Sequence, residues 1–326
     1  MTSFPNVLRM LPATLLTATV IPASAFAQEA VTLRLPWLLS VQGAGYVMAE
    51  AKGFYDEAGL DVTIEPGGPN LNSTALVASG ANTFGTNDVN NIILGATQGM
   101  DLVMVAACFQ KHPGGIITLE SSGIATPADL AGRTLAYSEG GPWTLTRAML
   151  TREGVSLDDI ELVVSGSSEL LISGEVDAKT GFAVNEPVAI ELAGHPTNII
   201  LPGDYGIRTY AEVIFTTRDY LEANPETVRA FVAATVKGYE YAYANPDETV
   251  AAVVEMNDQL DPVQQAGQFA LQRDYVITAE TEANGLCSID PAVIQGTLDL
   301  LKEFDGLETD LDVSTIFTTE FLPTTN

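Results

Sequence analysis

Residues 31–68 constrain the fold most, because they have the pattern of a strand, a helix and a second strand in close succession. Residues 31–35 alternate apolar and polar side chains, as a half-buried strand does. Residues 43–52 carry apolar side chains at helical spacing and end at Gly53, and a second strand pattern covers residues 60–64. Elements in this order predict two parallel strands with the helix packed across them.

Strand and helix patterns continue to alternate until about residue 216, and mostly helical patterns follow. The most periodic of these covers residues 222–244. Alternation of this kind predicts the α/β class. The chain has 326 residues, which suits one large α/β domain or two lobes that each bury a core.

Residues 1–27 read as a cleavable secretory signal. Arg9 is their one charged residue, residues 11–21 are mostly apolar, and residues 25–27 offer an A-x-A cleavage site. The apolar run is too short, and too interrupted by Thr and Pro, to suit a membrane anchor. We therefore expect a periplasmic protein.

The charge balance is strongly acidic. The net charge is −28, and it becomes −29 when Arg9 leaves with the signal. Binding to nucleic acid or to an anionic membrane is disfavoured, because phosphate contacts need Lys and Arg. The acidic surface is better explained by solubility, and it does not by itself indicate a cationic ligand.

Two cysteines and two histidines are present. Export would permit a disulfide between Cys108 and Cys287, but residues so far apart in sequence are equally suited to be separate, small buried side chains, and we favour that interpretation. His112 and His195 have no metal-ligand spacing with Cys or carboxylates, so we expect no metal and no cofactor.

Several phrases, in their order along the chain, carry a family resemblance. They are G-Y-V-M-A-E-A-K-G-F-Y-D-E-A-G-L-D-V from residue 45, L-V-A-S-G-A-N-T-F-G from residue 76, G-I-A-T-P-A-D-L-A-G-R-T from residue 123 and N-E-P-V-A-I-E from residue 185. The chain resembles the periplasmic solute-binding proteins of ABC importers, in the branch that binds thiamine pyrimidine precursors, riboflavin or sulfonates.

The resemblance implies a fold of two lobes, of the type II binding-protein kind. Lobe one would comprise residues 31–120 plus 215–326, and lobe two residues 121–214. The chain would cross between them twice, near residues 119–123 and near residues 212–216. A small-molecule ligand, a membrane permease as partner, and a monomeric state are also implied.

Candidate binding residues follow the strands, since ligands of parallel sheets bind at the carboxyl ends of strands. In lobe one they are Trp37, Gln42, Gly68, Asn70, Asn87, Asp88, Phe109 and Gln110, and in lobe two Ser138, Gly140, Gly141, Trp143, Asn185, Glu186, Asp204 and Tyr205. Tryptophan can stack on a flat ring, glycine turns at helix starts let the backbone approach a ligand, and carboxylates pair with N–H groups. Core packing, plain turns and helix caps are the competing interpretations.

A flat heterocycle such as a thiamine pyrimidine precursor fits this residue set best. Taurine or another sulfonate is the runner-up, but it would prefer an Arg, which most of these loops lack; riboflavin comes third. Yeast enzymes that make the thiamine pyrimidine resemble this chain too. They carry a Cys-rich motif and a reactive Lys and His that this chain does not show, so we expect a binding protein and not an enzyme.

Overall fold

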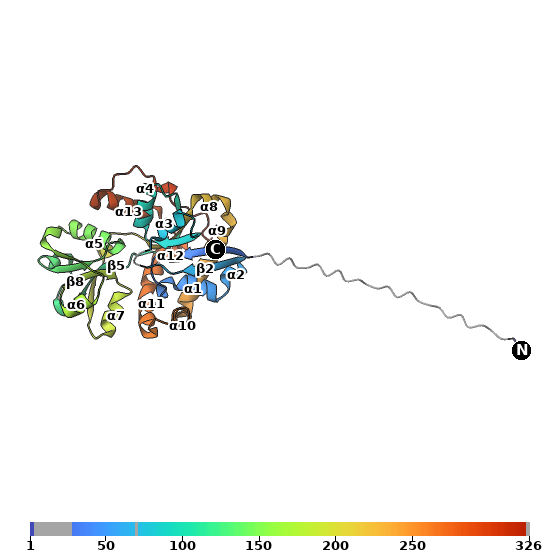
Figure 1. Cartoon of the computed structure of the whole chain (residues 1–326), viewed down its shortest axis with the longest axis horizontal. Coiled ribbons are helices and arrows are strands. Elements are labelled where there is room, and N and C mark those ends of the chain that lie inside the picture. The colour runs from blue at the N-terminus through green and yellow to red at the C-terminus, as the bar shows by residue number, and fades with distance from the viewer. Residues whose placement is uncertain (3–27, 69–70, 324–326) are drawn as a thin grey trace.

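The computed structural model describes residues 1–2, 28–68 and 71–323. The predicted signal segment, apart from its first two residues, lies outside the described residues, and so does Asn70. The described chain forms two five-stranded sheets, each covered by helices, and Figure 1 shows them as two bodies side by side. Lobe one is named here for the sheet that contains β1, and lobe two for the sheet that contains β5.

Lobe one has the strand order β2-β1-β3-β10-β4. Its strands are β1 (Glu29–Arg34), β2 (Leu60–Glu65), β3 (Phe84–Asn87), β4 (Leu102–Phe109) and β10 (Ala211–Thr217). β1 pairs in parallel with β2 and β3, whereas β10 is antiparallel to β3 and β4. The predicted parallel strand–helix–strand unit at the start of the chain is confirmed.

Lobe two has the order β7-β6-β8-β5-β9. Its strands are β5 (Gly114–Leu119), β6 (Thr134–Tyr137), β7 (Glu161–Val164), β8 (Ala178–Phe182) and β9 (Thr197–Ile200). β6 is parallel to β7 and β8, and β5 runs antiparallel to β8 and β9.

Helices cover both sheets (Figure 1). With lobe one lie α1 (Ala44–Ala51), α2 (Phe54–Glu57), α3 (Ser73–Ala78), α4 (Val89–Thr97), α8 (Arg218–Ala223), α9 (Pro225–Ala244), α10 (Pro246–Met256), α11 (Pro262–Val276), α12 (Ala279–Asn284) and α13 (Pro291–Phe304). With lobe two lie α5 (Gly141–Arg152), α6 (Glu169–Ser173) and α7 (Glu186–Leu192). Apolar clusters fill both faces of each sheet, as expected of strands covered on two sides.

The chain crosses between the sheets at residues 110–113 and again at residues 206–210. The first crossover comes earlier than the predicted 119–123, because Gly114 pairs with Phe182 and so β5 belongs to lobe two. The second comes just before the predicted 212–216, since β10 already begins at Ala211. β5 and β10 each run antiparallel to the neighbouring β8 and β3, so both crossovers lie at the edge where those strands end.

α13 connects the lobes a third time. Leu300 and Phe304, near its end, pack into the core of lobe two, and Arg147 of α5 forms an ion pair of 2.6 Å with Asp305. The sequence assigned residues 215–326 wholly to lobe one. That assignment did not foresee that α13 packs on the cores of both lobes.

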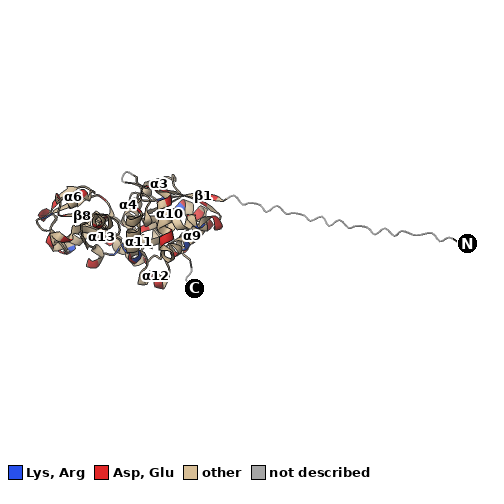
Figure 2. Ribbon diagram, turned by 90° about the horizontal axis from the view of Figure 1, so that it is seen from below, with Lys and Arg blue, Asp and Glu red and all other residues tan. Residues whose placement is uncertain are grey.

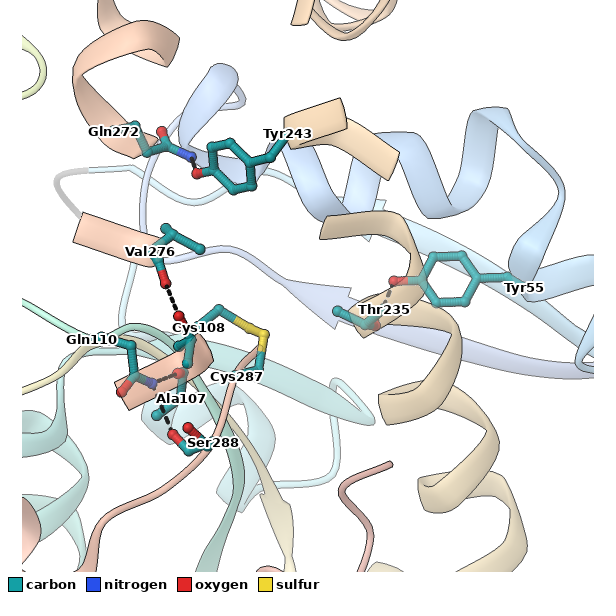
Figure 3. The surroundings of a disulfide bond; sticks show 11 residues. Tyr55, Ala107, Cys108, Gln110, Thr235, Tyr243, Gln272, Val276, Cys287 and Ser288 are labelled. Carbon is teal, nitrogen blue, oxygen red and sulfur yellow. Dashed lines mark hydrogen bonds between the residues drawn. A yellow bond between two sulfur atoms is a disulfide. The ribbon is translucent and has the colours of Figure 1, made fainter. Parts of the chain in front are cut away.

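The two cysteines form a disulfide, so the preference for unpaired side chains was wrong (Figure 3). Both are fully buried, as expected. The segment after α12 lies along β4, where Ala107 N donates to Cys287 O over 2.9 Å. Gln110 Nε2 donates to Ser288 O over 2.8 Å, so the residues before α13 are tied to the start of the first crossover.

Acidic residues are distributed over both lobes, and basic residues are few (Figure 2). In the described part of the chain, no helix combines the length and the apolarity needed to cross a bilayer.

Candidate ligand-binding cleft

A cavity of about 300 Å³ opens between the lobes. Its lining residues are Pro36, Trp37, Gln42, Asn87, Asp88, Ser138, Glu139, Pro142, Gly166, Thr180, Gly181, Phe182, Asn185, Glu186 and Glu212. They come from the carboxyl ends of β1, β3, β6, β7 and β8 and from the start of the antiparallel strand β10. Seven of the sixteen sequence candidates lie on this cavity: Trp37, Gln42, Asn87, Asp88, Ser138, Asn185 and Glu186.

Trp37 is the exposed aromatic side chain of the cleft. It is 45% exposed, which is unusual for so large an apolar surface. Its loop is fixed from behind, because Gly67 N donates to Trp37 O over 2.8 Å. A Cβ on Gly67 would approach Leu35 O to 2.3 Å, so only glycine allows this contact. Gly68, the predicted ligand contact, lies off the cavity, and it is Gly67 that supports the Trp37 loop.

Asp88 reaches from lobe one to the start of α5 in lobe two. A Cβ on Gly141 would lie 2.3 Å from Asp88 Oδ2, so this glycine makes room for the carboxylate. The N-terminus of a helix favours a negative charge. Gly140 and Gly141, which were predicted to contact the ligand, do not line the cavity, and Asp88 lies at this helix start instead.

His112, in the first crossover, backs Asp88. Its Nε2 lies 3.1 Å from Asp88 Oδ2 without forming a hydrogen bond, and its Nδ1 accepts a 2.9 Å hydrogen bond from Gly114 N. A nitrogen that accepts carries no proton, so the imidazole is neutral in this arrangement. Asp88 therefore has a polar neighbour and no cation.

Glu212 is the second carboxylate of the lobe-one wall, and the sequence analysis missed it. It is 3% exposed and accepts a hydrogen bond from Gln42 Nε2. Burial, and secondarily the charge of Asp88, raise the pKa of Glu212 to about 7. Its backbone φ of 52° is uncommon for a residue other than glycine, and such conformations cluster at ligand-binding sites.

Glu186 is the matching carboxylate of lobe two. Its Oε1 lies 3.3 Å from Lys179 Nζ, and its Oε2 accepts from Phe182 N over 2.9 Å. Lys179 is fully buried behind the cavity wall. A buried lysine needs such a partner, so Glu186 is both charge-balanced and held in place.

The two strand-end asparagines form side-chain hydrogen bonds within the protein, at both ends of the amide in Asn87 and at the oxygen in Asn185. Asn87 donates to Ser73 and Thr74, and its oxygen accepts from Asp88 N and Asn91 Nδ2. Asn185 Oδ1 accepts from Gln268 Nε2 of α11, which is a contact between the lobes. Both line the cavity, but Asn87 has no donor left for a ligand.

The remaining candidates lie away from the cavity. Trp143 is 5% exposed and stacks on Tyr137 in the core of lobe two, with ring centroids 4.2 Å apart. Phe109 is fully buried in the core of lobe one, and the side-chain amide of Gln110 donates to Ala107 O and Ser288 O. Asp204 is exposed and Tyr205 packs on the lobe-two core.

The sequence analysis did not name Glu139, Glu212 and Lys179 as candidates, although the last two carry a signal that could have been used. Glu212 and Lys179 are charged residues in otherwise apolar or small strands, A-E-V-I-F and A-K-T-G-F, where a charge needs a partner or a function. Within the described ranges, no group of three or more His, Cys, Asp or Glu residues could hold a metal ion.

The family model described as NMT1/THI5 like matches residues 40–249, which include most of the cavity. The chain belongs to this family. The riboflavin-binding protein RibY of Chloroflexus aurantiacus is 27% identical, over 96% of this chain and 91% of that protein. The formylaminopyrimidine-binding protein of Halalkalibacterium halodurans is 29% identical over 72% of each chain.

An enzyme is also among the relatives. The 4-amino-5-hydroxymethyl-2-methylpyrimidine phosphate synthase THI13 of Saccharomyces cerevisiae is 27% identical over 72% of this chain and 73% of its own length. Among solved structures, the periplasmic aliphatic sulphonate binding protein SsuA of Escherichia coli superposes with a TM-score of 0.72, at 18% identity, over 91% of this chain and 95% of that one. The predicted two-lobe binding-protein fold is confirmed.

Proposed function

We propose that this protein is the extracytoplasmic solute-binding component of an ABC importer, and that it holds a small flat heterocycle, such as a thiamine pyrimidine precursor, in the cleft between its lobes. The cavity with an exposed Trp37 on one wall and carboxylates on both walls is the observation that carries the proposal. A flat ring stacks on the indole, and its N–H groups donate to Asp88, Glu186 and Glu212.

The lobes close on the ligand as a hinge. The chain passes from one lobe to the other at residues 110–113 and 206–210, so small backbone rotations in these two segments change the width of the cleft. The ligand shifts the balance toward the closed form by its additional contacts in that form. The closed monomer then docks on a membrane permease, and no bond in the ligand is made or broken.

Riboflavin is the first alternative, because a riboflavin-binding relative matches almost the whole chain. Taurine and other sulfonates are less well supported. No Lys or Arg among the described residues lines the cavity, and a sulfonate would face carboxylates. The fold likeness to sulfonate binders does not extend to that chemistry.

Pyrimidine synthesis is the alternative of another class, since synthases are among the relatives. Within the described residues no cysteine lines the cavity, and both cysteines are joined in a disulfide. His112 lies behind Asp88 and also does not line the cavity. These observations favour binding over chemistry.

The test is a thermal-shift screen of the protein without its signal segment, followed by isothermal titration of each hit. Hydroxymethylpyrimidine should raise the melting temperature, and taurine should not. Stabilisation by taurine alone would overturn the proposal that the ligand is a heterocyclic pyrimidine. Stabilisation by riboflavin alone would establish the first alternative, a riboflavin-binding protein. A ligand that is altered after long incubation with the protein would establish the enzyme.

A further inference from the structure

The charges around the cleft do not balance. Four carboxylates line the cavity, from Asp88, Glu139, Glu186 and Glu212, and no Lys or Arg of the described ranges does. Lys179 lies behind the wall and neutralises Glu186 alone. The other three carboxylates form no ion pair with Lys or Arg within the described part of the chain.

The surroundings of Glu212 contain no positive charge. Gln42 donates a hydrogen bond to it and Thr86 lies beside it, and both of these residues are uncharged. Asp88 faces it from the start of α4, and the neutral His112 stands behind Asp88. A buried carboxylate with a second carboxylate beside it is costly to ionise.

The hydroxyls of Tyr46 from α1 and Tyr239 from α9 also face Glu212. Burial first, with the nearby carboxyl as a further cause, raises the pKa of Tyr46, so this hydroxyl stays uncharged. Burial likewise raises the pKa of Tyr239. No element packed against Glu212 therefore supplies the cation that its ionised form needs.

We propose that the cleft binds its heterocycle as a cation, which lies against the carboxyl groups of Asp88 and Glu212. Because burial raises the pKa of Glu212 to about 7, entry of the cation near that pH drives release of the Glu212 proton to solvent. The inference rests on the proposed function and narrows it from flat heterocycles to positively charged ones. The net charge of the cleft is unchanged, because one positive charge enters with the ligand and one proton leaves Glu212. A cation near Glu212 also interacts favourably with the carboxyl group of Asp88, which lines the same side of the cavity.

Two probes of equal size and different charge test this. Thiamine carries a thiazolium cation, and its triazole analogue replaces that ring with a neutral one. Isothermal titration at about pH 8 should give thiamine an affinity at least about tenfold higher. Thiamine should also bind about tenfold more tightly at pH 8 than at about pH 6, because Glu212 is ionised at the higher pH.

Proton release is read from the wild-type protein alone. The apparent binding enthalpy of thiamine near pH 7 should differ between phosphate and Tris buffers in the direction of proton release. Glu212→Gln should weaken thiamine binding at pH 8 about tenfold and abolish the pH dependence. Glu240→Gln, an equal change of charge at an exposed position of α9, should alter neither.

Equal affinity for thiamine and its triazole analogue, or thiamine binding without proton release, would overturn the cation proposal. Hydroxymethylpyrimidine and riboflavin, both neutral, are titrated beside them. If only these neutral compounds bind, the solute-binding function stands and the cation proposal fails. If no compound binds, including taurine, both fail.

Discussion

Each lobe presents a carboxylate that follows an asparagine at the end of a strand, Asp88 after β3 and Glu186 after β8. Glu186 has Lys179 behind it and a backbone N–H in front, so its charge is balanced before any ligand arrives. Asp88 has a neutral imidazole and a second carboxylate, Glu212, nearby. The two strand-end segments, here called the rims of the cleft, look alike in sequence but differ in whether their carboxylate has a cationic partner.

The tryptophans of the two lobes also differ, because only one of them is available to a ligand. The one tryptophan of lobe one, Trp37, is exposed in the cleft, whereas Trp143 of lobe two is part of the core. Lobe one therefore offers the stacking surface and two of the three unpaired carboxylates, Asp88 and Glu212, whereas lobe two contributes Glu139. We expect it to bind the ligand first, with lobe two closing over it.

The largest expected effect separates the two tryptophans by stability. Trp143→Ala should lower the free energy of unfolding by about 4 kcal/mol, because it empties a buried site against Tyr137. Trp37→Ala should change it by less than about 1 kcal/mol, since nearly half of this residue is exposed to solvent. Urea denaturation of both variants measures this, and equal losses would contradict the comparison.

The next effect is a pH dependence confined to lobe one. Folding raises the pKa of Glu212 from 4.5 to about 7, so the folded protein holds this proton more tightly than the unfolded chain. The resulting stability is present below the ordinary pKa and is lost as the pH rises through about 7. Relative to Glu212→Gln, the wild type should lose about 3 kcal/mol between about pH 4 and pH 8.

Denaturation curves of both proteins over that pH range give the difference directly. A difference that stays constant with pH would mean that Glu212 is ionised in the folded protein, and the contrast between the two rims would then disappear.

In lobe two the expected effect comes from breaking the ion pair. Lys179→Met should cost about 2 kcal/mol, because Glu186 is left without its cation while still partly buried. The double variant with Glu186→Gln should recover part of this loss. A double-mutant cycle by chemical denaturation measures the coupling, and independent effects of the two changes would show that lobe two is not charge-balanced by this pair.

The smallest expected effect is on affinity. Trp37→Ala should weaken binding of hydroxymethylpyrimidine about tenfold, because a stacked pair contributes about 1 kcal/mol beyond burial. Trp37→Phe should retain much of the affinity, since a flat ring remains. Isothermal titration decides it, and a loss as large for Phe as for Ala would indicate that the indole N–H, not stacking, holds the ligand.

The strand ends could be predicted from the sequence, and with them the positions of Asn87, Asp88, Asn185 and Glu186 on the cavity. Strand periodicity and the rule for parallel sheets suffice for that. Which side chains are free to bind could not be predicted. Asn87 is occupied by Ser73 and Thr74, which come from a helix whose packing no local pattern specifies.

Contacts between distant segments account for the other differences. The turn at Gly140 and Gly141 was predicted to meet a ligand, but Asp88 from the other lobe occupies the helix start. The disulfide joins residues 179 positions apart, a pairing that only the course of the chain after α12 reveals. Glu212 was missed because its strand, A-E-V-I-F, reads locally as core.

Mass spectrometry of the small molecule that co-purifies with the protein tests the central claim most directly. The account predicts a flat nitrogen heterocycle, released on denaturation and chemically unchanged after prolonged incubation with the protein. Recovery of a sulfonate, or of a heterocycle converted to a product, would contradict it.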